Sequence, residues 1–453
     1  MFLCCWLPLV ALIPMTLGTN PGVEVRLTEK GLEYGRQLGM ASIQQKLKTI
    51  KVPDISGSQK VSPIGKVQYS LSNLQIVDVG LPKSALDLVA GTGVRLSIGN
   101  AFLHLHGNWR VKYMKIIKDS GSFDLNVNDL TIATSIAIKS DETGRPVVSS
   151  VSCKAAVGSA SIKFHGGASW LYNLFKDFID KALRNALQKQ ICPLVADAVS
   201  DLNPRLKTLN VVAKVDQYAE IEYAMVSSPT VSNSSIDLSL KGEFYNIGKH
   251  QEPPFSPAAF SLPSQINNML YIGVSVFTAN SAAFVYNTAG ALGLYITDDM
   301  IPHGFPIRLN TRTFGDFIPQ IAKRFPGLMM KLLVKTVKNP VISFEPNNVT
   351  VQTTGTETSV SAKLFVTEMR LAGAVTLNKM TLTLGKSYVG EFQVKSLHCI
   401  LQMVLKVVVI PIVNVELAKG YPLPTLGKMK LVNTQLQVLK DYILIGTDVQ
   451  FVG

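Results

Sequence analysis

The stretch Phe123-Asp-Leu-Asn-Val-Asn128 alternates apolar and polar side chains with a period of two residues. This period predicts a strand with one buried and one solvent-facing side, as in antiparallel sheets. The same alternation recurs along the chain, for example in Ile236–Leu240, Val375–Asn378, Met380–Leu384 and Val449–Phe451. Strands at this frequency indicate large, strongly curved sheets or barrels.

Four stretches interrupt the alternation and are predicted to be helical: residues 28–50, 169–199, 315–324 and 396–419. The second has an apolar stripe wide enough to fill the open side of a curved sheet, and Ser169 is placed to cap it. Pro411 should kink the last one, because proline cannot donate the backbone hydrogen bond of a helix interior.

The segment Lys249–Pro263 holds four prolines in fifteen residues and is predicted to be an extended, semi-rigid connector. It divides the chain into two parts that each hold many strands and two helical stretches. We therefore expect a signal peptide over 1–18, an N-terminal module over 19–248, this linker over 249–263, and a C-terminal module over 264–453.

The composition combines apolar character with basic charge. Of the 453 residues, 47% are hydrophobic and 17% charged, and the formal net charge is +13. These values exclude intrinsic disorder, collagen and coiled coil. The apolar content favours a large core or a lipid partner, and the charge favours nucleic acid, a phosphate-bearing lipid or a membrane surface.

The first 18 residues, MFLCCWLPLVALIPMTLG, are uncharged and almost wholly apolar. They predict a secretory signal peptide with small residues at its cleavage site, and hence a secreted, extracellular protein. The alternative, a membrane anchor, is disfavoured by the short length and the two prolines. The next most apolar stretch, Ile400–Leu417, is interrupted by polar residues and Pro411, so we expect a soluble mature chain.

Removal of the signal peptide leaves Cys153, Cys192 and Cys399. An oxidising compartment predicts one disulfide and one remaining thiol. Cys399 lies in an apolar helical segment and is expected to be a small buried hydrophobic residue. Asn233 and Asn348 begin Asn-X-Ser/Thr triplets and are candidate glycosylation sites, which requires both to lie on the surface.

Catalytic and metal-binding motifs are missing from the sequence, which has no HExxH, GxSxG, P-loop, GxGxxG after a strand, or CxxC pair. His104 and His106 share a strand face, but no cysteine or carboxylate clusters beside them, so no metal site is expected. The chain is therefore predicted not to be an enzyme.

Basic charge is concentrated locally. From Arg95 through Lys118 there are five basic residues and no acidic one, and Arg110, Lys112, Lys115 and Lys118 interleave with bulky residues such as Trp109. A second cluster, Lys46, Lys48 and Lys51, ends the first helix. Such residues suit a surface that pairs with phosphates and contacts acyl chains. The alternative is a solvated amphipathic hairpin with no ligand. Nucleic acid would bind similar residues, but the predicted export and the apolar composition disfavour it.

In several ordered segments the sequence resembles the family of bactericidal/permeability-increasing and lipopolysaccharide-binding proteins, which also contains lipid-transfer proteins. The resemblance covers essentially the whole mature chain. It is carried by Asn20–Arg26, Ile50–Ser56, Gly121–Leu125, Cys153 and Cys192, Glu252–Pro257, Asp298–Pro302, Gly420–Pro424 and Leu444–Asp448.

The resemblance implies an α+β fold, an elongated boomerang of two barrels of twisted antiparallel sheet wrapped around helices, joined by a central sheet and a proline-rich linker. It implies a Cys153–Cys192 disulfide, and an apolar phospholipid pocket in each barrel. Lipid A would bind Lys46, Lys48, Lys51, Arg110, Lys112, Lys115 and Lys118 at the N-terminal tip. We also expect Trp109 to contact the lipid, where apolar and aromatic side chains near it would shield the acyl chains. Around Thr353–Thr358 about 20 residues are missing relative to the family's usual length.

These observations predict a secreted innate-immune protein that binds lipopolysaccharide of Gram-negative bacteria and is antibacterial or neutralising. The alternative is a phospholipid or lipopolysaccharide transfer protein that presents lipid to host receptors or lipoproteins. A lipid hydrolase is disfavoured by the missing nucleophile motifs. We expect no cofactor other than bound phospholipid, a monomer, and partners that include phospholipids and the bacterial outer membrane but no nucleic acid.

Overall fold

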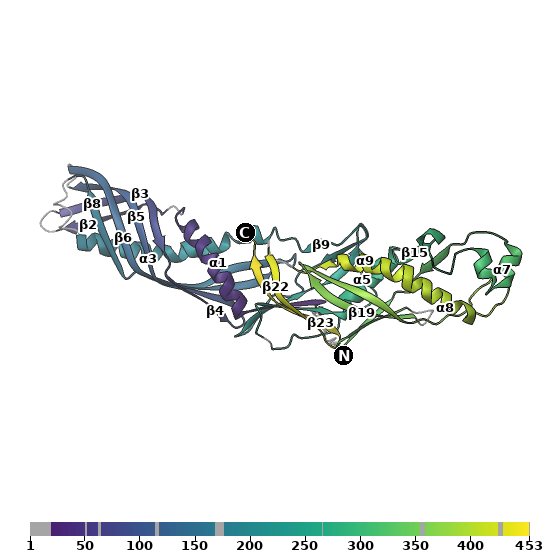
Figure 1. The fold of residues 1–453 in the computed structure, drawn as a ribbon. Helices are drawn as coiled ribbons and strands as arrows, with labels where there is room; N and C mark the ends of the chain where they lie inside the picture. The colour runs from purple at the N-terminus through teal and green to yellow at the C-terminus, as the bar shows by residue number, and fades with distance from the viewer. Residues whose placement is uncertain are drawn as a thin grey trace, which may run out of the picture.

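The computed structural model describes residues 20–49, 52–61, 65–113, 117–167, 176–264, 266–353, 358–424 and 429–452. They form an elongated molecule with a strand-rich barrel at one end, a sheet in the middle, and a second region of strands and helices at the other end (Figure 1). This arrangement confirms the predicted α+β fold. The predicted signal peptide, residues 1–18, lies outside the described residues.

The N-terminal barrel is a seven-stranded antiparallel sheet. Its main order is β2-β3-β5-β6-β7, while β4 pairs with β5 and β8 with β6. The strands are β2 (Ile55–Val61), β3 (Gly65–Gly80), β4 (Lys83–Val89), β5 (Gly93–Tyr113), β6 (Ile117–Ser140), β7 (Pro146–Ala156) and β8 (Ser159–His165). The predicted strand Phe123–Asn128 lies in β6, where Phe123, Leu125 and Val127 are buried in the core.

Residues with positive φ angles interrupt and bend the long strands of this barrel. Asn73, Asn100 and Asp129 have φ angles of 54°, 53° and 54°. The first two coincide with register shifts between β3 and β5 and between β5 and β6. Asn and Asp tolerate this left-handed conformation, and the resulting bulges bend the strands and increase their twist.

Helix α3 (Lys176–Ser200) closes the barrel against β7 and β8. Its Leu187 and Ile191 join the same core as the inward-facing strand residues. The Cys153–Cys192 disulfide links β7 to this helix, as predicted. Ser169, the predicted cap, lies outside the described residues. The first predicted helix is α1 (Glu29–Leu47), which packs on β1, β3 and β4, and α4 (Asn203–Leu206) follows α3.

The central sheet joins the two halves of the chain. Its order is β11-β12-β1-β14-β23-β22. The strands are β1 (Val23–Thr28), β11 (Thr230–Val231), β12 (Ser235–Leu240), β14 (Leu270–Ser275), β22 (Met429–Val438) and β23 (Tyr442–Phe451). A small sheet of β9 (Val212–Lys214), β10 (Ala219–Glu222) and β13 (Glu243–Asn246) adjoins the same core.

The proline-rich segment forms no helix or strand over residues 250–263. Its end is tied to the central sheet by Arg26 of β1. The Arg26 guanidinium donates to the Pro263 carbonyl at 2.7 Å, and it forms a paired hydrogen bond with the Asp237 carboxylate at 2.7 and 2.8 Å. The linker is therefore anchored to strands from the N-terminal half.

The C-terminal region contains a five-stranded sheet, β17-β18-β19-β20-β21, and a two-stranded ribbon, β15-β16. The strands are β15 (Gly293–Ile296), β16 (Leu332–Lys335), β17 (Val341–Glu345), β18 (Asn348–Thr353), β19 (Thr358–Thr367), β20 (Arg370–Lys379) and β21 (Tyr421–Pro422). The helices are α5 (Val276–Thr288), η1 (Asp298–Met300), α6 (Thr311–Gly315), α7 (Pro319–Arg324), α8 (Lys395–Val404), the π-helix η2 (Leu405–Val409) and α9 (Ile410–Lys419).

Three local predictions need correction here. Met380–Leu384 is not a strand; His398 donates from Nε2 to the Met380 carbonyl at 2.8 Å, which holds this segment against α8. The predicted helix over 315–324 is two short helices, α6 and α7. Pro411 is preceded by the π-helical segment η2, which accommodates the missing backbone donor.

The helical stretch Lys395–Lys419 is long and apolar enough to cross a membrane by length and composition, and 22% of its most apolar window is buried. Its inner side packs through Leu397, Ile400 and Val404, whereas α9 contains no buried residue. Cys399 points away from that inner side and is exposed, so the expectation of a buried thiol was wrong.

Candidate functional site

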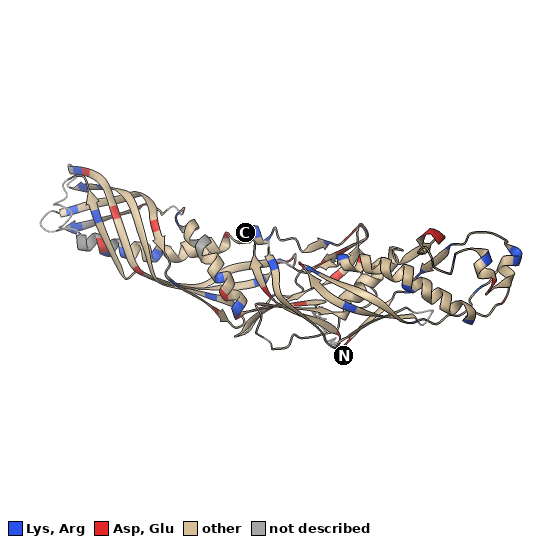
Figure 2. Ribbon diagram, viewed as in Figure 1, with Lys and Arg blue, Asp and Glu red and all other residues tan. Residues whose placement is uncertain are grey.

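The far end of the N-terminal barrel carries basic residues on the β5-β6 hairpin (Figure 2). Arg110 and Lys112 lie on β5, and Lys118 lies on β6. Lys112 is the cross-strand partner of Lys118, and Arg110 is that of Ser120. Because the intervening Trp109 and Val111 face the core, the basic side chains face outward, and all three are exposed.

The neighbouring β2-β3 hairpin adds two lysines that the sequence analysis missed. Lys60 and Lys66 are direct cross-strand partners, and both are exposed. Gln68, two residues beyond Lys66, pairs with Lys112 of β5. The period of two therefore places both lysines on the same outer face as Arg110, Lys112 and Lys118. The alternating residues on either side of the β2-β3 turn could have indicated this hairpin from the sequence. Only the register between β3 and β5 shows that it lies beside the β5-β6 hairpin.

We call these five residues the N-terminal tip: Lys60, Lys66, Arg110, Lys112 and Lys118. Among the described residues none of them forms an ion pair. Two like-charged pairs, Lys60–Lys66 and Lys112–Lys118, face each other directly, which is unfavourable in a sheet. Such an arrangement binds an anion well, because the anion relieves the repulsion between the paired lysines.

The predicted cluster at the end of α1 is only partly brought to this site. Lys48 follows α1, and its Nζ lies 3.2 Å from Oδ1 of Asp78 on β3. The hydrogen bond from Lys48, with one from the backbone of Val79, lowers the pKa of the Asp78 carboxyl. Lys48 is thus already paired. Lys46 belongs to α1, but its side chain, like Lys51 and Lys115, lies outside the described part of the chain.

Trp109 is not at the surface, which corrects its predicted role as an acyl-chain contact. Its side chain is 2% exposed and packs edge-on against Phe164, with ring centres 5.9 Å apart. The indole N–H donates to the His165 carbonyl at 3.3 Å. Gly121 lies opposite Trp109, and a Cβ there would come 2.9 Å from the indole nitrogen. The alternation that turns Arg110 outward turns Trp109 into the core.

A carboxylate bridges two histidines farther along the same outer face. The Asp124 carboxylate contacts His106 Nδ1 and His165 Nε2, both at 2.8 Å. Hydrogen bonds from His106 and His165 lower the pKa of Asp124. No group of three or more His, Cys, Asp or Glu suited to a metal ion is found among the described residues.

The two candidate glycosylation sites lie on the surface, as a glycan requires. Asn233 lies in the turn between β11 and β12, and Asn348 is the first residue of β18. Both are exposed. Their use remains a prediction, as do the phospholipid pockets implied by the resemblance.

Comparison with known proteins tests the resemblance. The N-terminal domain model of the LBP / BPI / CETP family matches residues 31–204, and its C-terminal domain model matches residues 213–356 and 350–451. The chain belongs to the LBP / BPI / CETP family. The family match covers both the barrel that carries the N-terminal tip and the region beyond the central sheet.

Individual members of the family align over nearly the whole chain. A bactericidal permeability-increasing protein of Sebastes schlegelii is 82% identical and covers 100% of both chains. A lipopolysaccharide-binding protein of Mus musculus is 34% identical over 96% of this chain and 95% of its own. A crystal structure of lipopolysaccharide binding protein has a TM-score of 0.64, 33% identity, and covers 95% of this chain and 99% of its own.

The alignment with the Sebastes relative also bears on the shortened segment of the C-terminal region. It extends over 473 positions, whereas this chain has 453 residues. The match to the C-terminal family model is divided at residues 350–356. Both observations agree with the predicted loss of about 20 residues near Thr353–Thr358. In this chain β18 and β19 pair directly on either side of that point.

Proposed function

We propose that this chain is a secreted, non-enzymatic protein of innate defence that binds lipopolysaccharide of Gram-negative bacteria through the N-terminal tip. The similarity to proteins named for binding lipopolysaccharide and for killing bacteria supports this function. The observation that carries it is the outer face of the two hairpins. Five basic side chains there have no ion-pair partner among the described residues, and in each hairpin one lysine lies directly opposite another.

The chemistry of the ligand fits this face. Lipid A carries phosphate groups, and lysine and arginine form strong charge-assisted hydrogen bonds with phosphate. The lysine pairs would hold phosphates between neighbouring strands, and the long aliphatic stems of the lysines would lie against acyl chains. Binding should weaken as salt is added, because the exposed charges are screened. We further propose that the mature chain is a monomer, carries phospholipid, and has no catalytic role.

A charge-reversal variant tests the tip. Arg110→Glu, Lys112→Glu and Lys118→Glu together should lower the affinity for immobilised lipopolysaccharide about 100-fold or more, at about 1 kcal/mol for each basic residue near an anionic surface. The matched control reverses three exposed lysines away from the tip, Lys83, Lys139 and Lys207, and should bind as wild type. Equal affinity of the tip variant and the wild-type protein would contradict the assignment.

A further inference from the structure

A second surface, at the opposite end of the molecule, combines basic charge with exposed apolar side chains. Between Asp316 and Glu345 the sequence holds five basic residues and no acidic one: Lys323, Arg324, Lys331, Lys335 and Lys338. In the same stretch Phe325, Leu328, Met329, Leu333 and Val337 are exposed, Met329 at 65% and Val337 at 80%. We call this stretch with Tyr295 the C-terminal tip.

The β15-β16 ribbon has one face packed on the core and one face exposed to solvent. Leu294 and Ile296 of β15, with Leu332 and Val334 of β16, pack inward on the core of this region. Tyr295 and Leu333 are cross-strand partners on the opposite face, where Lys331, Lys335 and Val337 are also exposed. A solvent-facing side of a ribbon normally carries polar residues, whereas this one alternates lysines with large apolar groups.

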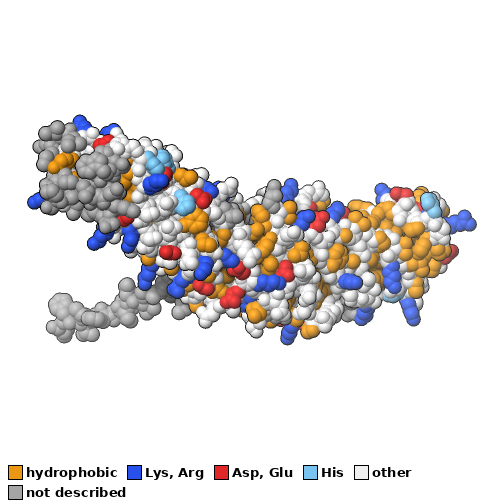
Figure 3. All heavy atoms as spheres, turned by 60° about the vertical axis from the view of Figure 1, so that its left-hand side comes forward, with side chains coloured by type: hydrophobic (Ala, Val, Ile, Leu, Met, Phe, Trp, Pro, Cys, Tyr) orange, Lys and Arg blue, Asp and Glu red, His pale blue; other side chains and the backbone are white. Residues whose placement is uncertain are grey.

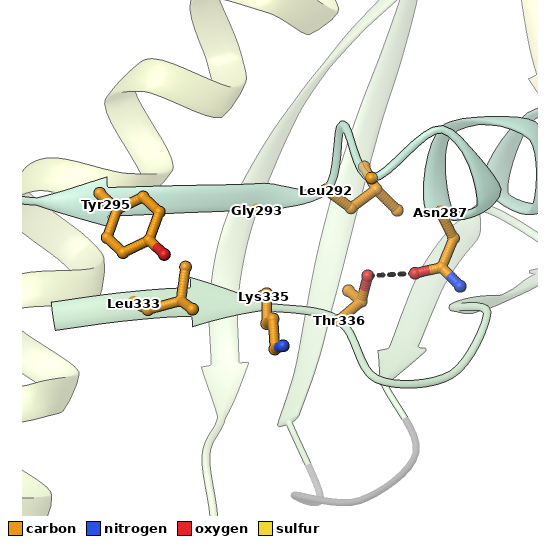
Figure 4. Close-up of a pocket in the computed structure, with 8 residues that line it drawn as sticks. Asn287, Leu292, Gly293, Tyr295, Leu333, Lys335 and Thr336 are labelled. Carbon is orange, nitrogen blue, oxygen red and sulfur yellow. Dashed lines mark hydrogen bonds between the residues drawn. The ribbon is translucent and has the colours of Figure 1, made fainter.

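The ribbon face is hollowed by a cleft of about 290 Å³ (Figure 4). Leu292, Tyr295 and Leu333 give it apolar walls, and Lys335 lies on the same strand as Leu333. At one end Thr336 donates from its hydroxyl to the Asn287 side-chain oxygen at 2.5 Å. The cleft thus places the apolar side chains of Tyr295 and Leu333 next to the ammonium group of Lys335.

Three lysines of the C-terminal tip are available to a partner. Within the described ranges, Lys331, Lys335 and Lys338 form no ion pair. Arg324, the last residue of α7, donates to the carbonyl oxygen of Tyr388, a residue that is 77% exposed. The Nζ of Lys386 lies 4.9 Å from the centre of that ring. A second aromatic and basic pair therefore lies beside the tip.

Exposed apolar groups are concentrated in this half of the protein. Of the 25 large hydrophobic side chains exposed among the described residues, 15 lie between Tyr295 and Leu417. Figure 3 shows hydrophobic side chains gathered at this end of the molecule, with Lys and Arg projecting around them. Contiguous exposed apolar surface on a soluble protein marks an interaction site.

We propose that the C-terminal tip docks on the surface of a bilayer that contains anionic phospholipid. The apolar side chains would enter the headgroup region, and the lysines would extend along the boundary to the phosphates, as amphipathic basic surfaces do. A bilayer is favoured as the occupant because it offers negative charge and apolar depth side by side. This surface acts independently of the N-terminal tip, so one molecule can contact two lipid surfaces at once.

The test uses the full chain with Arg110→Glu, Lys112→Glu and Lys118→Glu as background, in which two lysines against three glutamates leave the N-terminal tip with a net negative charge that does not attract an anionic surface. This protein should co-sediment with vesicles of phosphatidylcholine and phosphatidylglycerol, and only weakly with phosphatidylcholine alone. Adding Lys331→Glu with Lys335→Glu, or Met329→Ser with Leu333→Ser, should lower the partition coefficient about tenfold or more. The matched control, Val77→Ser with Val151→Ser on the N-terminal barrel, should leave it unchanged.

An inserted fluorophore separates docking from nonspecific attraction. Met329→Trp should shift its emission to the blue on the anionic vesicles, while Val77→Trp should not. In the otherwise wild-type chain, the C-terminal tip variants should retain lipopolysaccharide affinity, which keeps this proposal separate from the proposed function. Loss of all vesicle binding in the background protein, or equal binding by the tip and control variants, would overturn the proposal.

Discussion

Lys112 on β5 lies directly opposite Lys118 on β6, and neither has an ion-pair partner among the described residues. Lys60 and Lys66 repeat the arrangement on the adjacent hairpin. Like charges that face each other across a sheet are destabilising. Under the proposed function, these pairs lower the stability of the free protein and strengthen its binding to an anionic ligand.

The first prediction follows from this opposition. Lys118→Ser should raise the free energy of unfolding by about 0.2–1 kcal/mol, because it removes the repulsion on Lys112. The same variant should bind lipopolysaccharide more weakly. Urea denaturation and a binding assay on the same samples measure both changes. Lys139→Ser, at the other end of β6, is the control and should change neither. A loss of stability in Lys118→Ser would show that the lysine pair is not strained.

The second prediction concerns Trp109. Trp109→Ala should lower the stability of the barrel by about 3–5 kcal/mol, because a fully buried aromatic side chain leaves a cavity. Trp109→Phe fills most of that volume and should retain wild-type affinity for lipopolysaccharide, since the indole does not reach the surface. Thermal unfolding and binding measurements check the two effects. A stable Trp109→Phe protein with greatly reduced affinity would return this residue to the binding site.

The third prediction concerns the cysteines. Cys153 and Cys192 are 39 residues apart and connect β7 to α3, so Cys153→Ser with Cys192→Ser should cost about 4 kcal/mol of stability. Cys399 is exposed and should react with a maleimide in the folded protein without loss of structure. Cys399→Ser, the control, should abolish that labelling and change the denaturation midpoint little. Labelling that requires denaturant would contradict the exposed position.

Local patterns predicted many elements but not their partners. Alternation located β6, β12, β20 and the end of β23 because each has one face on a core. It could not show that Val23 of β1 pairs with both Leu240 and Val274, since such register depends on long-range packing. It also failed at Met380–Leu384, where a hydrogen bond to His398 replaces strand pairing.

The sequence likewise predicted only part of the candidate site, because local patterns do not show which strands pair. The density of basic residues identified Arg110, Lys112 and Lys118, because neighbours in sequence stay neighbours on one hairpin. The same density grouped Trp109 with these residues, although alternate side chains of a strand face opposite sides and that of Trp109 faces the core. Lys60 and Lys66 join the site only through the pairing of β3 with β5. Exposure in the C-terminal tip likewise depends on which face of the β15-β16 ribbon packs on the core.

The fourth prediction is a pH dependence in the central sheet. Glu24 of β1 accepts a hydrogen bond from the Ser239 hydroxyl at 3.0 Å, and burial raises the pKa of its carboxyl. Because the pKa of Glu24 is higher in the folded than in the unfolded chain, folding favours the protonated carboxyl. The stability that this group contributes is therefore complete at a pH below the unfolded-state pKa, and it is lost as the pH rises through the folded-state pKa. Glu24→Gln should therefore stabilise the protein more at pH 7 than at pH 4.

Thermal unfolding at the two pH values measures this difference. Glu142→Gln, at an exposed turn, is the control and should not stabilise the protein at neutral pH. An equal effect of Glu24→Gln at both pH values would show that the Glu24 carboxyl titrates alike in the folded and unfolded chains.

The fifth prediction contrasts the two ends of the helical stretch Lys395–Lys419. Ile400 of α8 is 3% exposed, whereas Val415 of α9 is 63% exposed and α9 has no buried residue. Asn414 ties α9 to β20 through its side chain, which accepts from the Val375 N–H at 2.7 Å and donates to the Val375 carbonyl at 3.2 Å. Ile400→Ala should therefore cost about 2–5 kcal/mol, and Val415→Ala less than about 0.5 kcal/mol.

Urea denaturation of the two variants measures this contrast, and Asn414→Ala tests the tie to β20, since it leaves the Val375 N–H without its acceptor. A large loss of stability in Val415→Ala would mean that this side of α9 is covered in solution.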